Sequence, residues 1–253
     1  MNVLILALIM MMWVMTHSWS VDTMPNPKIA PVECGRRQLA GGLLSRTKPS
    51  SICDPDELMS KDGKDALEGL ISNLEEACGN KVEFAVALIK KIDPPTGWLG
   101  SFQDVEWQAS VFARALHDKW GVGDAVRHNG ALVFISTEDR ASFISTGSSV
   151  QYALSDTALD FILNSAKPSM RAQEWSLAFS SIVFDIAKAF ASEEKLLRID
   201  GVDEFRHKKR ERYSGLQRDA AGNYVEVDES VTPGSQTEVN PGTLVAILVF
   251  VVA

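Results

Sequence analysis

Five aspartates and one asparagine lie beside the apolar stretches of the chain, where their oxygens could bind a hard cation. These residues are Asp54, Asp56, Asp124, Asn129, Asp139 and Asp156. Carboxylate, amide and carbonyl oxygens are the ligands that Ca²⁺ and Mg²⁺ prefer in proteins. We therefore predict a site for Ca²⁺ or Mg²⁺ whose metal ligands are Asp54, Asp56 and Asp124.

A second set of residues is expected to form a ligand loop beside that ion. Its members are Gly123, Asn129, Asp139 and Arg140. Glycines at 121, 123 and 130 would let the backbone approach an ion or a phosphate closely. Arg140 has the planar fork that binds phosphate through two hydrogen bonds, and it is equally suited to pair with Asp139 or Glu138. A metal ion here would polarise a phosphoryl oxygen and activate water.

The same polar residues also have an ordinary structural interpretation. Asp54 and Asp156 suit helix caps or turns, Asp139 suits a hairpin, and Gly123-Asp124 is common turn chemistry. The sequence has no EF-hand spacing, no Gly-x-Ser-x-Gly elbow and no Cys-x5-Arg phosphatase loop. Its four histidines have no nucleophile partner, and His117 and Lys119 are predicted to face solvent. Both interpretations of the aspartates stay open.

The elements that must position these residues are strands and helices in alternation. Residues 132–135 form a continuous apolar run, and residues 142–146 alternate enough to be its hairpin partner. Residues 82–89 predict a further interior strand. A fully apolar strand needs cover on both of its faces, which helices elsewhere in the chain must supply.

Four helices are predicted around these strands. Ser60 caps the first, which places Leu67, Leu70, Ile71 and Leu74 on one face and stops at residues 78–80. The second begins at Ser101 or Asp104 and carries the stripe Val105, Ala109, Phe112, Leu116 and Trp120. Ser155 caps a short third helix, and Lys167-Pro168 separates it from a fourth that runs from about Trp175 to Phe190.

This order of elements predicts an α/β domain in which helices cover both faces of a small mixed sheet. Ligands of open α/β sheets gather at the carboxyl ends of the strands. We therefore expect the six polar residues to converge at that edge.

The two ends of the chain predict membrane targeting. Residues 1–20 resemble a secretory signal peptide with cleavage after Ser20, because an apolar run precedes the small residues Ser18 and Ser20. Residues 21–51 are expected to form an N-terminal arm, 52–191 the domain, and 192–240 a charged helical extension and linker. Residues 243–253 fit the start of a transmembrane helix or, alternatively, a short buried tail. We expect a single-pass membrane protein of the secretory pathway, with its domain lumenal or extracellular.

The charge of the chain predicts which partners it binds, and its cysteines predict a disulfide. The formal net charge of −8 excludes nucleic acid as an expected partner. One basic cluster, residues 206–212, is either a solvated helix face or a contact for anionic headgroups or an acidic partner. Of the three cysteines, we expect Cys34 and Cys53 to pair, while Cys53–Cys78 is the alternative.

Several motifs together resemble the TPM domain family. Its extended start is similar to the segment with Asp54, Asp56, Leu58 and Ser60, although that segment is one residue shorter here. The W-G-x-G helix end is similar to 120–124, and the following strand to 128–133. The remaining similar positions are Asp139-Arg140, Gly147 and Leu154-Ser155-Asp156. The resemblance covers about Cys53 to Phe190 and is greatest to the eukaryotic membrane-attached branch.

The resemblance implies a three-layer α-β-α sandwich of Rossmann-like appearance. The family includes a thylakoid-lumen acid phosphatase, exported bacterial proteins that bind calcium, and an accessory subunit of an acetylcholine-gated channel. Fold alone therefore leaves function open. From the predicted anchor and acidic domain, we expect an accessory or interaction module that contacts a membrane protein complex. The alternative is a divalent-metal-dependent acid phosphatase that acts on phosphomonoesters.

Overall fold

The computed structural model describes residues 18–35, 49–93, 105–214, 216–218 and 224–226. Its centre is a four-stranded sheet of order β1-β2-β3-β4, in which β1 is Ile52–Cys53, β2 Glu83–Ile89, β3 Gly130–Ser136 and β4 Ala141–Thr146. The first three strands are parallel, and β4 pairs antiparallel with β3. The predicted α/β class, mixed sheet and hairpin are therefore confirmed. A second, two-stranded sheet joins β5 (Leu216–Arg218) and β6 (Tyr224–Glu226).

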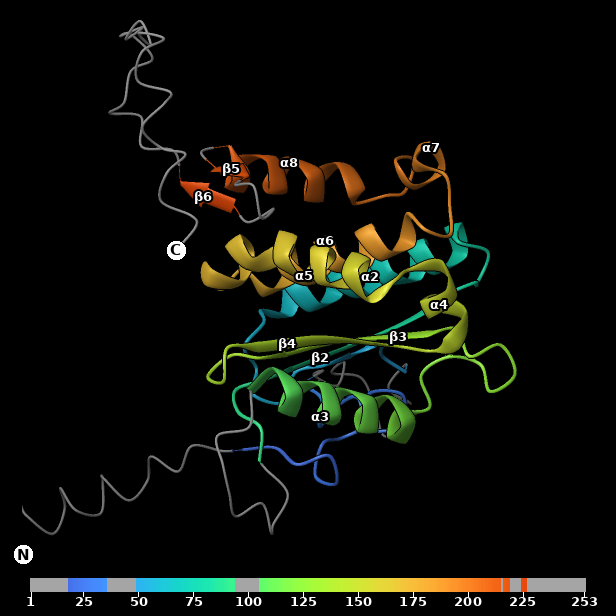
Figure 1. Cartoon of the computed structure of the whole chain (residues 1–253), viewed down its shortest axis with the longest axis vertical. Helices are drawn as coiled ribbons and strands as arrows, with labels where there is room; N and C mark the ends of the chain where they lie inside the picture. The colour runs from blue at the N-terminus through green and yellow to red at the C-terminus, as the bar shows by residue number, and fades with distance from the viewer. Residues whose placement is uncertain (1–17, 36–48, 94–104, 215, 219–223, 227–253) are drawn as a thin grey trace, which may run out of the picture.

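Helices cover both faces of the central sheet (Figure 1). α3 (Val105–Trp120) and the N-terminal segment lie on one face. α2 (Lys61–Ala77), α5 (Asp156–Arg171) and α6 (Trp175–Ala187) lie on the other, and the short α4 (Ser148–Ala153) follows β4. α7 (Glu193–Leu196) and α8 (Val202–Tyr213) pack outside α6, so a further helical layer is added to the predicted three.

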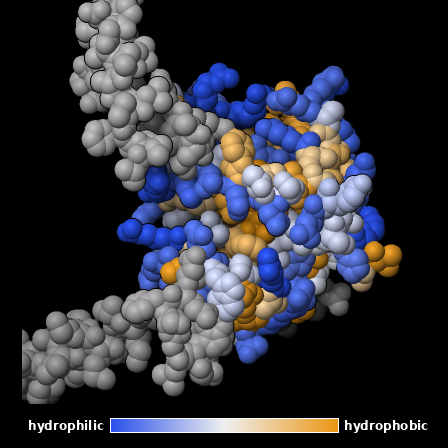
Figure 2. Space-filling view, viewed as in Figure 1, coloured by the Kyte–Doolittle hydropathy of each residue, from blue (hydrophilic) through white to orange (hydrophobic). Residues whose placement is uncertain are grey.

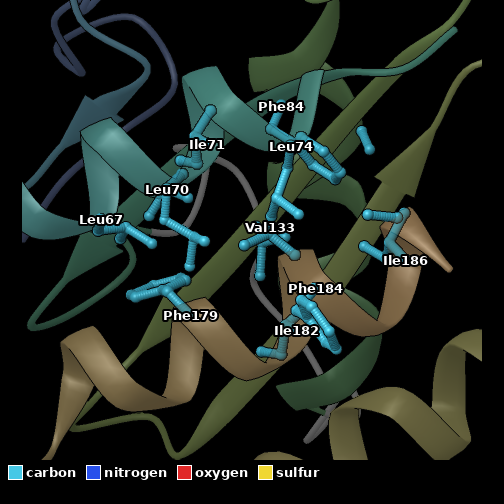
Figure 3. Close-up of a cluster of buried hydrophobic side chains, with 14 of the residues drawn as sticks. Leu67, Leu70, Ile71, Leu74, Phe84, Val133, Phe179, Ile182, Phe184 and Ile186 are labelled. Atoms are coloured by element: carbon cyan, nitrogen blue, oxygen red, sulfur yellow. The ribbon is translucent and has the colours of Figure 1, made fainter. Parts of the chain in front are cut away.

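The core between the sheet and its upper helices follows from the apolar periodicity of α2 and α6. Ser60 caps α2, because its hydroxyl accepts the N–H of Gly63, and the helix then buries one stripe toward the strands. Figure 3 shows side chains of α2, β2, β3 and α6 pointing toward one another, among them Leu67, Leu70, Ile71, Leu74, Phe84, Val133, Phe179, Ile182 and Ile186. α3 forms a second core on the opposite face, where Phe112 packs against Phe134 with ring centroids 4.9 Å apart.

α5 continues through Pro168, so the prediction that Lys167-Pro168 ends this helix is wrong. Proline removes one backbone donor and normally breaks a helix interior. Here the helix ends three residues later at Arg171, and the amide of Ala172 still donates to the carbonyl of Pro168. The helix therefore passes through the proline and ends within one turn of it, and the proline ring is buried.

The charged segment after residue 191 packs onto the domain more closely than its composition predicts. Phe205 of α8 is buried against Phe184, with ring centroids 5.6 Å apart. At the other end of α8, the hydroxyl of Tyr213 donates to the carbonyl of Ser165 at 2.8 Å. Hydrophilic side chains cover much of this upper layer (Figure 2). The segment is therefore an exposed helix anchored through a few aromatic residues.

The N-terminal segment is part of the folded domain, although its sequence predicts only an arm. Met24 is buried in the α3-side core. Cys34 and Cys53 form a disulfide, as predicted, which joins this segment to β1. Cys78 is free and buried, and burial raises the pKa of its thiol to about 11. The alternative Cys53–Cys78 pairing is therefore wrong.

Residues 1–17 of the predicted leader (1–20) and the whole of the predicted transmembrane segment 243–253 lie outside the described residues. Within the parts of the chain that the structure describes, no helix combines the length and apolar character needed to cross a membrane.

Three glycines bring the loop before β3 into direct backbone contact with the start of β3 and with the end of β4. Gly123 has a φ of +88°, and a Cβ there would lie 2.4 Å from the amide nitrogen of Gly130. A Cβ on Gly130 would lie 2.3 Å from the carbonyl oxygen of Val122, and one on Gly147 2.2 Å from that of His128. Gly123 and Gly130 were predicted to admit an ion or a phosphate, but the close approach they allow is between segments of this chain.

Replacing Gly130 with alanine should destabilise the fold toward the upper end of the roughly 1–3 kcal/mol that overpacking costs. The new methyl group would meet backbone, which cannot rotate away. The matched control is Gly69→Ala in α2, where a Cβ meets nothing within 4 Å. Because alanine favours a helix more than glycine does, this control should stabilise the protein by about 0.5–1 kcal/mol. Urea unfolding measures both, and equal effects of the two substitutions would refute this account.

Candidate functional site

Asp54 follows β1 at the carboxyl edge of the sheet and is completely buried. Its Oδ1 accepts the amide of Leu58 at 2.8 Å, and its Oδ2 accepts the amide of Met59 at 2.9 Å. Oδ2 also lies 2.9 Å from Nζ of Lys64 in α2, which is buried too. Burial raises the pKa of the Asp54 carboxyl, and the Lys64 ammonium and the two amides oppose that rise. This aspartate therefore has no oxygen left without a donor.

The ammonium of Lys64 sits in a cradle of oxygens. Besides the Asp54 carboxylate, Nζ donates to the carbonyl of Gly35 at 3.2 Å and to that of Asp54 at 3.5 Å. Gly35 has a φ of +76°, and a Cβ there would lie 2.6 Å from Nζ. A carboxylate and two carbonyls resemble the ligands of a hard cation. Lys64 thus occupies the position beside Asp54 that a metal ion would need.

Asp56 lies at the same edge and joins two segments of the chain through hydrogen bonds. Its Oδ2 accepts the indole N–H of Trp19 at 3.1 Å and the amide of Lys90 at 2.7 Å. Trp19 belongs to the N-terminal segment, and Lys90 follows β2 directly. Asp56 therefore fixes the N-terminal segment against the end of the central strand.

Asp139 and Arg140 lie in the turn between β3 and β4, also at this edge. Oδ2 of Asp139 accepts the amide of Ile92 at 2.8 Å and the hydroxyl of Ser136 at 2.6 Å. Arg140 is exposed and has a φ of +54°, which the tight hairpin requires. The hairpin interpretation of Asp139 is therefore the one the structure supports.

Asp124 and Asn129 lie at the opposite edge, because they precede β3. Oδ1 of Asp124 accepts the amides of Val126 and Arg127, both at 2.9 Å, and these bonds hold the pKa of its carboxyl below the usual value. Asn129 accepts the amide of Asp124 at 2.8 Å and donates to the carbonyl of Asn80 at 3.1 Å. These residues shape the loop that follows α3.

The structure does not bring the predicted ligands together. Asp54, Asp56 and Asp139 lie at the carboxyl edge of the parallel strands, whereas Asp124 and Asn129 lie at the amino edge with Gly123, and Asp156 lines a cavity on that second side. Among the described residues, no group of three or more histidine, cysteine, aspartate or glutamate side chains could hold a metal ion. Asp54, Asp56 and Asp124 therefore do not fit a shared Ca²⁺ or Mg²⁺ centre.

A cavity of about 940 Å³ opens at the amino edge, and we call it the amino-edge basin. It is bounded by the carboxyl end of α3, the loop 121–128, β4 and the starts of α4 and α5. The polar residues that line it include Arg114, His117, Asp118, Asp124, His128, Ser145, Gln151 and Asp156. Glycines 121, 123 and 147 also line it. A second hollow of about 1010 Å³ lies between α2, α6 and α8.

His117 is the residue of this basin that sequence reasoning placed wrongly. Its side chain was predicted to face solvent, but it is buried. Nε2 lies 3.1 Å from the carbonyl oxygen of Val122, and Nδ1 lies 3.0 Å from the hydroxyl of Ser145. Its spacing from the buried Ala113 and Trp120, four and three residues away, was the available signal. His117 therefore ties α3 to both β4 and the loop.

A family model described as the TPM domain matches residues 52–189. The chain belongs to the TPM-domain family. Its match covers the sheet and helices α2 to α6, and so the whole of both edges described above.

Two solved structures of bacterial domains are similar to this TPM domain. One is the N-terminal domain of a protein from P. gingivalis, 20% identical with a TM-score of 0.49, where the match covers 68% of this chain and 92% of that one. The other is the N-terminal domain of a protein from Corynebacterium glutamicum, 17% identical with a TM-score of 0.36, where the match covers 53% and 76%. No curated protein matches the chain.

Removing the charge of Lys64 should destabilise the protein strongly. Lys64→Met leaves the Asp54 carboxylate buried without its counterion, which typically costs about 3–5 kcal/mol. The matched control is Lys61→Met, three residues earlier, whose exposed pair with Asp65 is worth roughly 0.3–0.5 kcal/mol. Chemical denaturation measures both variants. A loss for Lys64→Met no larger than that of the control would contradict a structural role for the pair.

Glu75 of α2 is a second perturbed carboxyl, near the amino end of β2. Its Oε1 accepts the amide of Phe84 at 2.7 Å. Burial raises the pKa of this carboxyl to about 7, and the charges of Glu83 and Glu68 add to the rise. Because the folded pKa exceeds the unfolded one, the native state binds the proton more tightly, and stability falls as the pH rises from about 4.5 to about 7.

Replacing Glu75 with glutamine should remove this pH dependence. Glutamine is neutral and keeps an oxygen for the amide of Phe84. At pH 8 the free energy of unfolding should rise by about 2 kcal/mol after allowance for partial exposure, and the gain should shrink toward pH 5. The exposed neighbour provides the control variant Glu76→Gln, which should show no such trend. Melting curves at the two pH values decide the matter, and a gain that is independent of pH would contradict the assignment.

Proposed function

We propose that this TPM domain is an interaction module held at a membrane, on its lumenal or extracellular side, where it binds a membrane protein complex without catalysing a reaction. The proposed anchor is the C-terminal segment that begins at residue 243, and the proposed leader is the N-terminal apolar run.

The observation that carries this proposal is a pair of exposed hydrophobic side chains beside the amino-edge basin. Val126 is 87% exposed and Tyr152 is 96% exposed. Their segments touch, because the amide of Ser149 in α4 donates to the carbonyl of His128 at 3.2 Å. Figure 2 shows a hydrophobic protrusion (orange) at the right edge, where Figure 1 draws the loop after α3. Exposed aromatic and aliphatic side chains on two segments that touch, next to a polar cavity, suit a contact with another protein.

The hydrogen bonds that the aspartates accept within this chain favour an interaction module over a phosphatase. A metal-dependent phosphatase needs carboxylates that converge and remain available to an ion and a water molecule. Asp54, Asp56, Asp124 and Asp139 each accept at least two hydrogen bonds from this chain. Their separation between two edges of the sheet further favours a structural role.

The test is whether the full chain, expressed in the cells it comes from, co-purifies with a membrane protein complex. The double variant Val126→Ser/Tyr152→Ala should co-purify with that complex at least tenfold less than the unchanged chain, because truncating contact residues at a binding centre costs about 1–2 kcal/mol each. The control is Val111→Ser, since Val111 is also exposed but lies on α3. Circular dichroism verifies that all variants fold.

Hydrolysis of a generic phosphomonoester, with and without Ca²⁺ or Mg²⁺, tests the alternative on the same purified protein. We expect no turnover above buffer. Metal-dependent turnover by the unchanged chain would establish the phosphatase instead. Unchanged co-purification of the double variant would overturn the proposed contact surface.

A further inference from the structure

Trp19 is an integral part of the folded domain, although it lies within the stretch predicted to be removed. Its amide donates to the carbonyl of Lys91 at 2.9 Å, and its carbonyl accepts the amide of Asp93 at 2.8 Å. It thereby forms a parallel β-bridge with Ile92. Both of its backbone polar groups are used, as in a strand that extends the sheet at the carboxyl edge.

The indole of Trp19 adds a second attachment. Its Nε1 donates to Oδ2 of Asp56 at 3.1 Å, the same oxygen that accepts the amide of Lys90. The ring also packs against the α3-side core. Asp56 was predicted to be a metal ligand, and this geometry assigns it instead to holding the start of the folded chain.

The residues that follow Trp19 continue the attachment without a break. Ser20 and Thr23 form a turn that is closed by reciprocal hydrogen bonds, and Met24 behind them is buried. Nζ of Lys119 donates to the carbonyls of Val21 and Asp22 at 2.7 and 2.8 Å. A chain that begins at Val21 would lose the bridge, the indole bond and half of the turn.

The sequence permits two positions for removal of a leader. Secretory signal peptidases require small residues one and three positions before the bond they hydrolyse. Ser18 and Ser20 satisfy this for cleavage after Ser20, as predicted above, and Thr16 and Ser18 satisfy it equally for cleavage after Ser18. Only the second position keeps every contact of Trp19.

We infer that a signal peptidase cleaves the Ser18–Trp19 peptide bond, so that the mature chain begins at Trp19. Water adds across the bond: Ser18 leaves as a carboxylate at the end of the leader, and Trp19 keeps its nitrogen as an ammonium group. That nitrogen still carries the N–H that bonds to the carbonyl of Lys91. The inference rests on the leader of the proposed function.

The test is expression of the full chain in a secretory host, followed by intact mass measurement and N-terminal sequencing. We expect Trp19 as the first residue. A first residue of Val21, or of any other position, overturns the inference while the leader stands. An uncleaved chain overturns both the inference and the leader. The Ser20→Leu variant should still be cleaved before Trp19, whereas cleavage after residue 20 would be blocked in it.

A second measurement tests the structural basis of the inference. A foreign leader is fused so that the secreted chain begins at Trp19 in one version and at Val21 in the other. The version that begins at Trp19 should melt at least about 3 °C higher, because it retains the bridge and the indole bond. Equal melting temperatures would show that Trp19 contributes nothing to the fold and would overturn the inference.

Discussion

The buried pair of Asp54 and Lys64 is the interaction on which the rest of the domain depends. It lies where three parts of the chain meet: β1, the first turn of α2 and the N-terminal segment, whose Gly35 carbonyl accepts from the same ammonium. The disulfide Cys34–Cys53 places both backbones beside the pair. Because a buried charge without a counterion is costly, the three parts must assemble together or not at all. The start of α2 and the edge of the sheet are thereby fixed at one point.

Elsewhere in the domain, the polar residues at the two edges of the sheet also join segments of the chain. At the carboxyl edge, Asp56 and Asp139 hold the chain that leaves β2. At the amino edge, His117 and the contact between Gly123 and Gly130 hold the loop after α3. The family motifs that drew attention in the sequence therefore maintain the two edges of the sheet. The amino-edge basin and the hydrophobic side chains beside it remain accessible.

Apolar periodicity was sufficient to predict β2, β3, β4 and the helices α2, α3 and α6, since burial on one face leaves a direct trace in the sequence. The site could not be predicted in the same way, because hydrogen-bond partners come from distant positions. Trp19 and Asp56 are 37 residues apart, and Ile92 and Asp139 are 47 apart. Asp54 has the same residue type whether it binds a metal or a lysine, and Lys64 looks like any surface residue of α2. Pro168 was misjudged because proline normally breaks a helix, and the burial of its ring within α5 cannot be read from the sequence.

The burial of Cys78 has a consequence for the order in which the chain folds. Its thiol is covered by α6, where it contacts the carbonyl of Ala187, a residue 109 positions later. During synthesis all three cysteines are complete long before α6 exists. In the presence of an oxidant, Cys53 can then react with either Cys34 or Cys78, and the shorter loop favours Cys34 only modestly. Correct pairing therefore depends on docking of the N-terminal segment before oxidation, or on later exchange of a wrong disulfide while Cys78 is still accessible.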